Sequence, residues 1–289
     1  MGSLYLVGTP IGNLGDITLR ALEILRQVSL VAAEDTRTSR KLLSHFDIHA
    51  PLVSYYEHNR LHRIDQIVQA LASGDVALVS DSGMPSISDP GYHLVRAAID
   101  AGYPVVPIPG PNAAIAALAA SGLPTDSFVF AGFLPRQESR RREALERLSW
   151  LTQTIVLYEA PHRIEACLAD LLRGLGDRRI AVAREVTKVH EEFWRGTLAA
   201  AMEHFTGPQR GEFTLVIAGR EETTWTRAEV ASALAALKSQ GVAPAEAARS
   251  VASEAGWPRA EVYRLGLDAA ADGDDHATSP ASSEAWDEA

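Results

Sequence analysis

A loop rich in glycine, proline and aspartate runs Ser80-Asp81-Ser82-Gly83-Met84-Pro85-Ser86-Ile87-Ser88-Asp89-Pro90-Gly91. It follows residues 75–79, which predict a short buried strand, and precedes residues 92–99, whose apolar positions have helical spacing. In open α/β sheets, ligands gather at the carboxyl ends of the strands. Asp81 and Asp89 would repel a phosphate but would suit an ammonium group or a ribose. The alternative is an ordinary strand-to-helix connection.

Composition sets the outer limits of the interpretation. The 289 residues are 46% hydrophobic, which is enough for two domains with sizeable cores. The single cysteine, Cys167, excludes an internal disulfide framework and indicates a core residue. The net charge of -10 argues against a strongly basic nucleic-acid binder, but seven acidic residues and no Lys or Arg lie from Asp268 onward. The remaining chain is nearly neutral, so a local basic patch would still matter.

The first half contains three further strands that end in candidate loops. Residues 4–7 feed the loop 8–16, which leads into a helix that we expect Asp16 to cap. This loop matches neither the dinucleotide nor the phosphate-binding glycine motif. Residues 30–33 lead to 34–37, which are either site residues or a helix cap with a surface turn. Residues 104–108 contain prolines and therefore predict a strand at a sheet margin, opening into 109–114.

In the second half, predicted strands run into charged loops. An aromatic strand over 127–135 precedes a concentration of arginines. Those arginines form either a solvated, salt-bridged helix face or a phosphate-contacting patch. Residues 154–158, 179–183 and 211–219 predict three more strands.

The rest of the chain is Ala-rich and helical between 226 and 271, with breaks at 241–244 and 256–258. Three short helices with tight turns resemble a small helix-turn-helix module, and a plain helical appendage is the alternative. We therefore expect an N-terminal α/β domain over 1–122, a C-terminal α/β domain over 123–222, the helical module over 223–267 and a disordered acidic tail over 268–289.

Neither a metal site nor a familiar nucleophile is expected. The sequence His190-Glu191-Glu192 is not the zinc-protease motif, and no serine-hydrolase elbow is present. A bound organic cofactor or general bases at strand ends would then carry the chemistry. Without a secretory signal or a long apolar run, the sequence predicts a cytoplasmic protein.

Seven motifs, in this order, resemble those of the tetrapyrrole-methylase superfamily and, within it, the branch that methylates ribosomal RNA. They lie at 8–16, 34–37, 80–91, 107–112, 132–135, 158–163 and 184–188. The resemblance implies an α/β fold of two domains with S-adenosylmethionine bound in the cleft between them, a small C-terminal helical module and a homodimer. It also implies methyl transfer to the ribose 2′-hydroxyl of a cytidine in the decoding region of 16S rRNA, free or in the small subunit.

The same resemblance assigns residues. The implied cofactor contacts are Pro10, Ser82, Gly83, Met84, Ile87, Asn112, Ala113, Glu159 and Val186. Met84 and Ser86 depart from the branch, which commonly has Thr and Leu there, so only backbone roles carry over at those two positions.

A ribose hydroxyl is a poor nucleophile, so a base or a proton relay is needed. The candidates are Asp35, Glu185 and Lys188, and phosphates would contact Arg136, Arg140, Arg141 and Arg142. Two alternatives stay open. One is a methyltransferase of this fold that acts on a tetrapyrrole precursor or a protein side chain, and the other is a non-catalytic nucleic-acid-binding protein.

Overall fold

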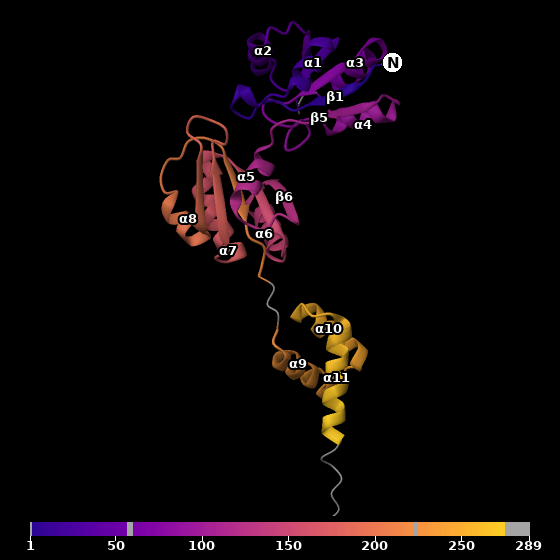
Figure 1. The fold of residues 1–289 in the computed structure, drawn as a ribbon, viewed down its shortest axis with the longest axis vertical. Helices are drawn as coiled ribbons and strands as arrows, with labels where there is room; N and C mark the ends of the chain where they lie inside the picture. The colour runs from indigo at the N-terminus through magenta and orange to yellow at the C-terminus, as the bar shows by residue number, and fades with distance from the viewer. Residues whose placement is uncertain (1, 57–59, 222–224, 275–289) are drawn as a thin grey trace, which may run out of the picture. The chain divides into compact units, whose positions relative to one another are not determined.

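The computed structural model describes residues 2–56, 60–221 and 225–274. Figure 1 shows the ribbon of the chain, which divides into two compact units, Met1–Arg220 and Glu221–Ala289. The first unit contains two five-stranded sheets, and the second is helical.

The first sheet is entirely parallel, with strand order β3-β2-β4-β1-β5. Its strands are β1 (Leu4–Val7), β2 (Leu30–Ala33), β3 (Leu52–Ser54), β4 (Val76–Val79) and β5 (Val105–Ile108). The proline-bearing β5 lies at a sheet margin, as predicted, because Pro107 cannot donate to a ladder on both sides. In a parallel sheet the carboxyl ends of the strands share one edge, so the loops after β1, β2, β4 and β5 lie at that edge.

Helices cover both faces of this sheet, and every residue of the central strand β4 is therefore buried. One face packs against α1 (Leu19–Gln27) and α2 (Thr36–His45). The other packs against α3 (Arg60–Ser73) and α4 (Tyr92–Asp100).

The expected cap of the first helix is wrong. Asp16 lies in the short 3₁₀ turn η1 (Leu14–Asp16), and Thr18 caps α1 instead. The Thr18 hydroxyl accepts a hydrogen bond of 3.1 Å from the Ala21 amide, which a residue two positions further upstream does not reach.

The second sheet has the order β6-β7-β10-β8-β9 and is parallel only between β6 and β7. Its strands are β6 (Phe128–Phe133), β7 (Thr154–Glu159), β8 (Arg179–Arg184), β9 (Glu192–Thr197) and β10 (Phe213–Ile217). One face packs against α6 (Glu138–Ser149), α7 (Ile164–Leu175) and α8 (Leu198–His204). The sequence did not predict β9 or α8, because β9 is an edge strand without a buried residue and lacks an apolar run.

The opposite face of the second sheet is covered by α5 (Ala113–Ser121). Ala114, Ala117 and Leu118 pack there with residues of β7, β8 and β10. Arg195 of β9 donates to the carbonyl oxygens of Ala120 and Ser121 at the end of the helix. The chain therefore leaves the core of the first sheet before residue 113, ahead of the boundary expected at 122.

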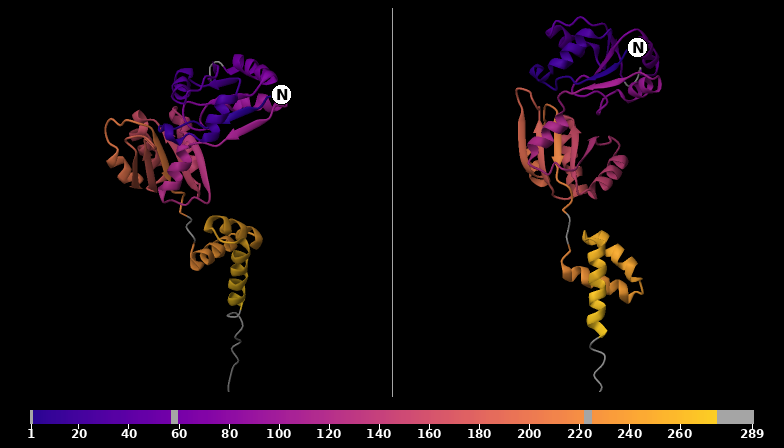
Figure 2. Two further views of the ribbon diagram at one scale, coloured as in Figure 1. Left: turned by 45° about the horizontal axis from the view of Figure 1, so that its top comes forward. Right: turned by 45° about the vertical axis from the view of Figure 1, so that its right-hand side comes forward.

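The second unit contains α9 (Arg227–Ser239), α10 (Pro244–Ala255) and α11 (Arg259–Asp274), and the three expected helices are confirmed. Both views in Figure 2 show them packed against one another. Their buried apolar side chains form a small core. The helix α11 continues to Asp274, beyond the tail boundary expected at 268, and residues 275–289 lie outside the described residues. Over the described ranges, every helix is too short or too polar to cross a membrane.

Candidate functional site

The loop after β1 is joined to the loop after β4 by a two-residue bridge. The amides of Thr9 and Gly83 each donate to the other residue's carbonyl oxygen, at 2.9 and 3.1 Å. The Thr9 hydroxyl also donates to the Ser80 carbonyl oxygen at 3.2 Å. These bonds hold the two loops in contact at the carboxyl edge of the first sheet.

The loop after β5 joins them through a contact between glycines. A Cβ placed on Gly8 would lie 2.7 Å from the Cα of Gly110 and 2.8 Å from the sulfur of Met84. These distances are too short for any side chain, so glycine is required at both positions. Three predicted site loops therefore meet at one place.

Two pockets open beside these loops. The smaller pocket is about 140 Å³ and is lined by Ile11, Ser82, Gly83, Met84, Ile87, Ser88, Asp89, Asn112, Ala113, Phe133, Tyr158, Glu212 and Thr214. The larger pocket is about 400 Å³ and is lined by Pro10, Ile11, Gly12, Leu14, Thr38, Ser39, Lys41, Leu42, Ser80, Asp81, Ser82, Lys188 and Glu212. They share Ile11, Ser82 and Glu212, so they adjoin, and together they reach the size of ordinary ligand sites, roughly 300–1,000 Å³.

The structure places most of the predicted cofactor residues at these pockets. The smaller pocket contains Ser82, Gly83, Met84, Ile87, Asn112 and Ala113, and the larger contains Pro10.

Glu159 and Val186 line neither pocket. The Glu159 side chain is fully buried, where it accepts a hydrogen bond of 2.8 Å from the Ala160 amide and lies 3.6 Å from the Arg163 guanidinium. Val186 belongs to the core between α5 and the second sheet.

Several residues that line the smaller pocket have no role predicted from the sequence. Phe133 is the last residue of β6 and Tyr158 the last but one of β7. The Tyr158 hydroxyl accepts a hydrogen bond of 3.2 Å from the Ala114 amide. Glu212 supplies a carboxylate beside that of Asp89, for which the sequence did predict an ammonium or ribose partner. A sequence signal for them exists, because each lies at or next to the end of a predicted strand or in the loop that follows one.

At the site, the carboxylates of Asp81 and Asp89 form no ion pair with other described residues, whereas Glu212 pairs with Lys188. Burial, followed by repulsion from Glu34, raises the pKa of Asp89 to about 7, with further repulsion from Asp81 and Glu212. Burial also raises the pKa values of Glu34 and Asp81. In the described part of the chain, no three metal-ligating side chains come together to hold a metal ion. Such surroundings favour an organic ligand that carries positive charge.

Backbone strain is concentrated in the same loops. Among the described residues, five non-glycine residues have positive φ, and four of them lie in two site loops. Ser86 and Ser88 have φ of 72° and 63° in the loop after β4, and Glu185 and Thr187 have 51° and 70° in the loop after β8. Strained backbone of this kind persists where a particular loop shape is needed.

Lys188 reaches the site from the loop after β8. Its ammonium group lies 2.9 Å from a carboxylate oxygen of Glu185 and 2.8 Å from one of Glu212. Burial lowers the pKa of Lys188, but the bonds to Glu212 and Glu185 outweigh it and raise that pKa overall. Glu185 is subject to burial as well, yet the Lys188 bond keeps its pKa below the usual value. Lys188 is therefore a cation and Glu185 a carboxylate at neutral pH.

Asp35 caps α2. Its carboxylate accepts a hydrogen bond of 2.8 Å from the Arg37 amide and pairs with the Arg37 side chain, which lowers the pKa of Asp35 to about 2. Asp35 lines neither pocket, although its amide donates to Asp81 at 3.0 Å. Of the three candidate bases, Lys188 alone lines one of these two pockets.

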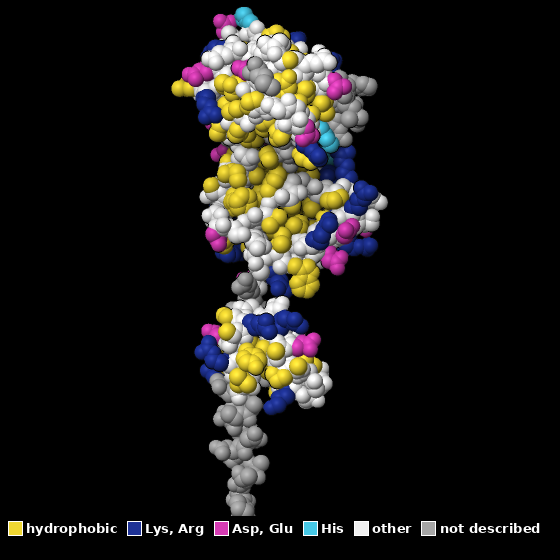
Figure 3. Space-filling model, turned by 90° about the vertical axis from the view of Figure 1, so that its right-hand side faces the viewer, with side chains coloured by type: hydrophobic (Ala, Val, Ile, Leu, Met, Phe, Trp, Pro, Cys, Tyr) yellow, Lys and Arg dark blue, Asp and Glu magenta, His cyan; other side chains and the backbone are white. Residues whose placement is uncertain are grey.

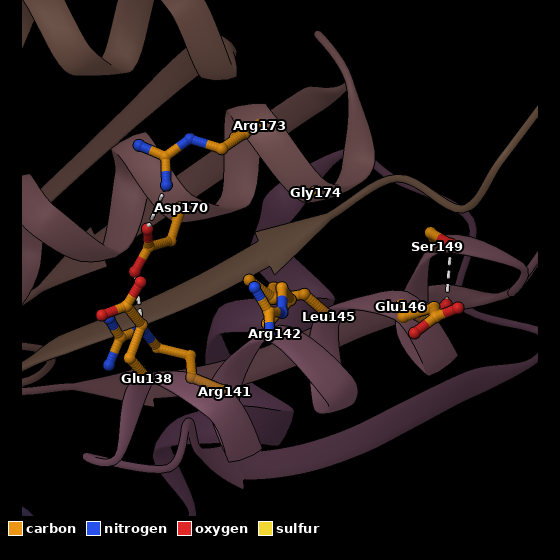
Figure 4. Close-up of a pocket in the computed structure, with 9 residues that line it drawn as sticks. All are labelled: Glu138, Arg141, Arg142, Leu145, Glu146, Ser149, Asp170, Arg173 and Gly174. Atoms are coloured by element: carbon orange, nitrogen blue, oxygen red, sulfur yellow. Dashed lines mark hydrogen bonds and ion pairs between the residues drawn. The ribbon is translucent and has the colours of Figure 1, made fainter.

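The predicted phosphate-contacting arginines lie on and before α6. Figure 4 shows Arg141 turned toward Asp170 of α7, with 2.5 Å between the charged groups. The pair with Asp170 joins α6 to α7. Arg141 also donates to the Arg136 carbonyl oxygen at 3.0 Å. The side chains of Arg136, Arg140 and Arg142 are exposed and form no ion pair within the described ranges.

The family model of Tetrapyrrole (Corrin/Porphyrin) Methylases matches residues 3–202. The chain belongs to this family. A family relative from Synechocystis sp., named ribosomal RNA small subunit methyltransferase I, is 50% identical over 279 residues, covering 94% of this chain and 100% of the relative. A protein of the same name from Halalkalibacterium halodurans is 47% identical, covering 91% and 94%.

A solved structure shares the fold of the methylase family. Uroporphyrin-III C-methyl transferase from Thermus thermophilus, complexed with S-adenyl homocysteine, is 19% identical with a TM-score of 0.53. The match covers 76% of this chain and 98% of that one. The predicted family and fold class are thereby confirmed.

Proposed function

We propose that this protein uses S-adenosylmethionine to methylate the RNA of the small ribosomal subunit, at the ribose 2′-hydroxyl of a cytidine in the decoding region. The observation that carries the proposal is the 50% identity, over 94% of the chain, to a protein named for methylation of small-subunit RNA. The converging loops support it, because they form pockets suited to a cationic ligand beside a second substrate.

The residues of the smaller pocket fit a sulfonium donor. S-adenosylmethionine carries two positive groups, a sulfonium and an ammonium, and a ribose. The carboxylates of Asp89 and Glu212 would complement the positive charge and accept hydrogen bonds from the ribose hydroxyls. Met84, Ile87 and Ala113 offer apolar surface to a purine. A sulfonium supplies its own leaving group, so these residues mainly have to align donor and acceptor.

Deprotonation of the hydroxyl is the remaining chemical task. Asp35, Glu185 and Lys188 stay the proposed group of proton-handling residues. Within it, Lys188 lies on the larger pocket as a cation, where it would stabilise an oxyanion and orient the acceptor. Glu185 orients Lys188 through the 2.9 Å bond.

The proposal includes partners and a location. Exposed Arg136, Arg140 and Arg142 would contact phosphates of the small subunit, in the cytoplasm. A homodimer is supported by the edge strand β6, on which Phe128 is 38% exposed. Figure 3 shows hydrophobic side chains gathered over the half of the first unit that carries the second sheet.

The proposal is tested by incubating the purified protein with methyl-labelled S-adenosylmethionine and small subunits that lack the modification. The expected label is in the rRNA, at a cytidine whose 3′ phosphodiester resists alkaline cleavage. Label in a tetrapyrrole or protein acceptor, with none in rRNA, would reject the proposal. Sedimentation of the free protein measures the dimer.

A further inference from the structure

Of the predicted donor contacts, only Pro10 and Ser82 line the larger pocket, and none lies on the helix α2. We propose, on the basis of the proposed function, that this pocket receives the target nucleotide of the RNA and that the cations of α2 hold its phosphates. The ligand class is thus a nucleotide turned out of its stack, with its ribose facing the smaller pocket.

The larger pocket adjoins the smaller one. Ile11, Ser82 and Glu212 line both pockets, so a group bound in the larger pocket adjoins whatever occupies the smaller one. Methyl transfer requires donor and acceptor atoms at near contact, so the acceptor nucleotide has to lie directly beside the donor.

The lining of the larger pocket suits a nucleotide. Ile11, Leu14 and Leu42 give the pocket an apolar wall on which a base can stack, and Thr38 and Asp81 add polar groups for its edges. Ser39 is 5% exposed, and its hydroxyl oxygen finds no hydrogen-bond partner in the described part of the chain. A buried polar group without a partner is rare in proteins, and a bound nucleotide would satisfy it.

The helix α2, which borders the larger pocket, is positively charged. The helix α2 carries Arg37, Arg40 and Lys41 and no acidic residue. Arg37 pairs with Asp35, whereas Arg40 and Lys41 are exposed and form no ion pair with other described residues. Lys41 itself lines the pocket. Because neither cation is paired within the described ranges, both are available to bind phosphates.

The helix α6 makes a useful contrast. Its arginines alternate with Glu138, Glu143 and Glu146, and Arg141 is paired with Asp170. Although α6 has more arginines, α2 has the higher net positive charge beside a pocket at the strand ends. We therefore expect α2 to contribute more to RNA binding near the target.

Filling the pocket tests the subsite. Thr38 is exposed, so Thr38→Trp should fold while placing an indole in the larger pocket, and Ser44→Trp on the same helix, outside the pocket, is the matched control. For Thr38→Trp, kcat/KM for small subunits should fall by at least about tenfold. Its affinity for S-adenosylmethionine by calorimetry should stay within about twofold. Normal methylation, or an equal loss of donor affinity, would overturn the subsite.

Neutralising the helix tests the phosphate contacts without turnover. Arg40→Gln with Lys41→Gln should weaken binding of small subunits and reduce the slope of log affinity against log salt by roughly two. Arg140→Gln with Arg142→Gln is the control on α6 and should change the slope less. An unchanged slope in the α2 variant would overturn the inference. Because binding is measured without turnover, the slope decides the inference even if the wild-type protein labels no rRNA, a result that would reject the proposed function separately.

Discussion

Gly12 and Lys188 are in direct contact across two loops. A Cβ on Gly12 would lie 2.3 Å from Cγ of Lys188 and 2.9 Å from its Cε. The loop after β1 therefore has to leave room for the lysine stem, and only then does the ammonium group reach Glu212 at 2.8 Å. Gly12, in the loop after β1, thus determines where the ammonium group of Lys188 lies.

Gly12→Ala should displace the Lys188 side chain and move its charge away from Glu212. We expect kcat/KM for methylation to fall by about tenfold or more, because small displacements in an aligned site are costly. In Gly15→Ala, from the same loop, the new Cβ would have only the Asn13 side chain as a close neighbour, at 3.2 Å. The expectation is wrong if both variants have wild-type kinetics.

Lys188→Met should destabilise the protein in a pH-dependent way. Glu185 has a lowered pKa, so it contributes stability that is present above its unfolded pKa and is lost as pH falls through the folded value. Without Lys188, Glu185 and Glu212 repel each other when ionised, at a cost of about 1 kcal/mol after solvent screening. The melting temperature should therefore be lower than that of the wild type at pH 7, and the difference should shrink as the pH falls below the ordinary glutamate pKa of 4.5. Lys238→Met, on exposed helix surface, should show no such trend.

Asp89→Asn should stabilise the free protein at high pH. Asp89 has a raised pKa of about 7, so its ionisation costs stability as pH rises from the unfolded pKa through the folded value. The variant should match the wild type only below the ordinary aspartate pKa of 3.8, and its melting temperature should increasingly exceed that of the wild type from there up to pH 8. Asp126→Asn, at an exposed position, serves as the control. A constant difference across this range would contradict the assignment, whereas reduced donor affinity in Asp89→Asn would support the role of Asp89 in the smaller pocket.

Arg163→Met should destabilise the second half strongly. Its guanidinium faces a fully buried Glu159 carboxylate at 3.6 Å, and one oxygen of that carboxylate has no hydrogen-bond partner among the described residues. Removing the cation leaves a buried unpaired charge, which costs about 3 kcal/mol. Adding Glu159→Gln should recover much of the loss in chemical denaturation. Calorimetry on Glu159→Gln alone tests the predicted cofactor contact, and unchanged donor affinity would leave Glu159 a purely structural role.

The sequence predicted the elements that consist of uninterrupted apolar runs. The strands β4, β7 and β10 are of this kind, and they are almost wholly buried. The half-exposed β9 has no such run and was missed. The loops after β1, β4 and β5, which the sequence predicted as site loops, do converge.

Individual roles could not be predicted in the same way, because they depend on where a side chain points. Glu159 follows a strand just as Asp35 does, yet one is buried beside Arg163 and the other caps a helix. Burial by the surrounding loops, invisible in the sequence, sets the pKa of Asp89. The arginine-rich stretch drew attention to α6, while the fewer but unpaired cations of α2 border a pocket.

The packing of α5 has a mechanical consequence. The helix follows the last strand of the first sheet, begins at the pocket residues Asn112 and Ala113, and is embedded in the core of the second sheet. Residues 109–112 are therefore the link between the last strand of the first sheet and a helix held by the second, and two prolines stiffen that link. A methyl donor seated on Asn112 and Ala113 would touch the point at which the two sheets are joined, so donor binding would restrain one sheet relative to the other.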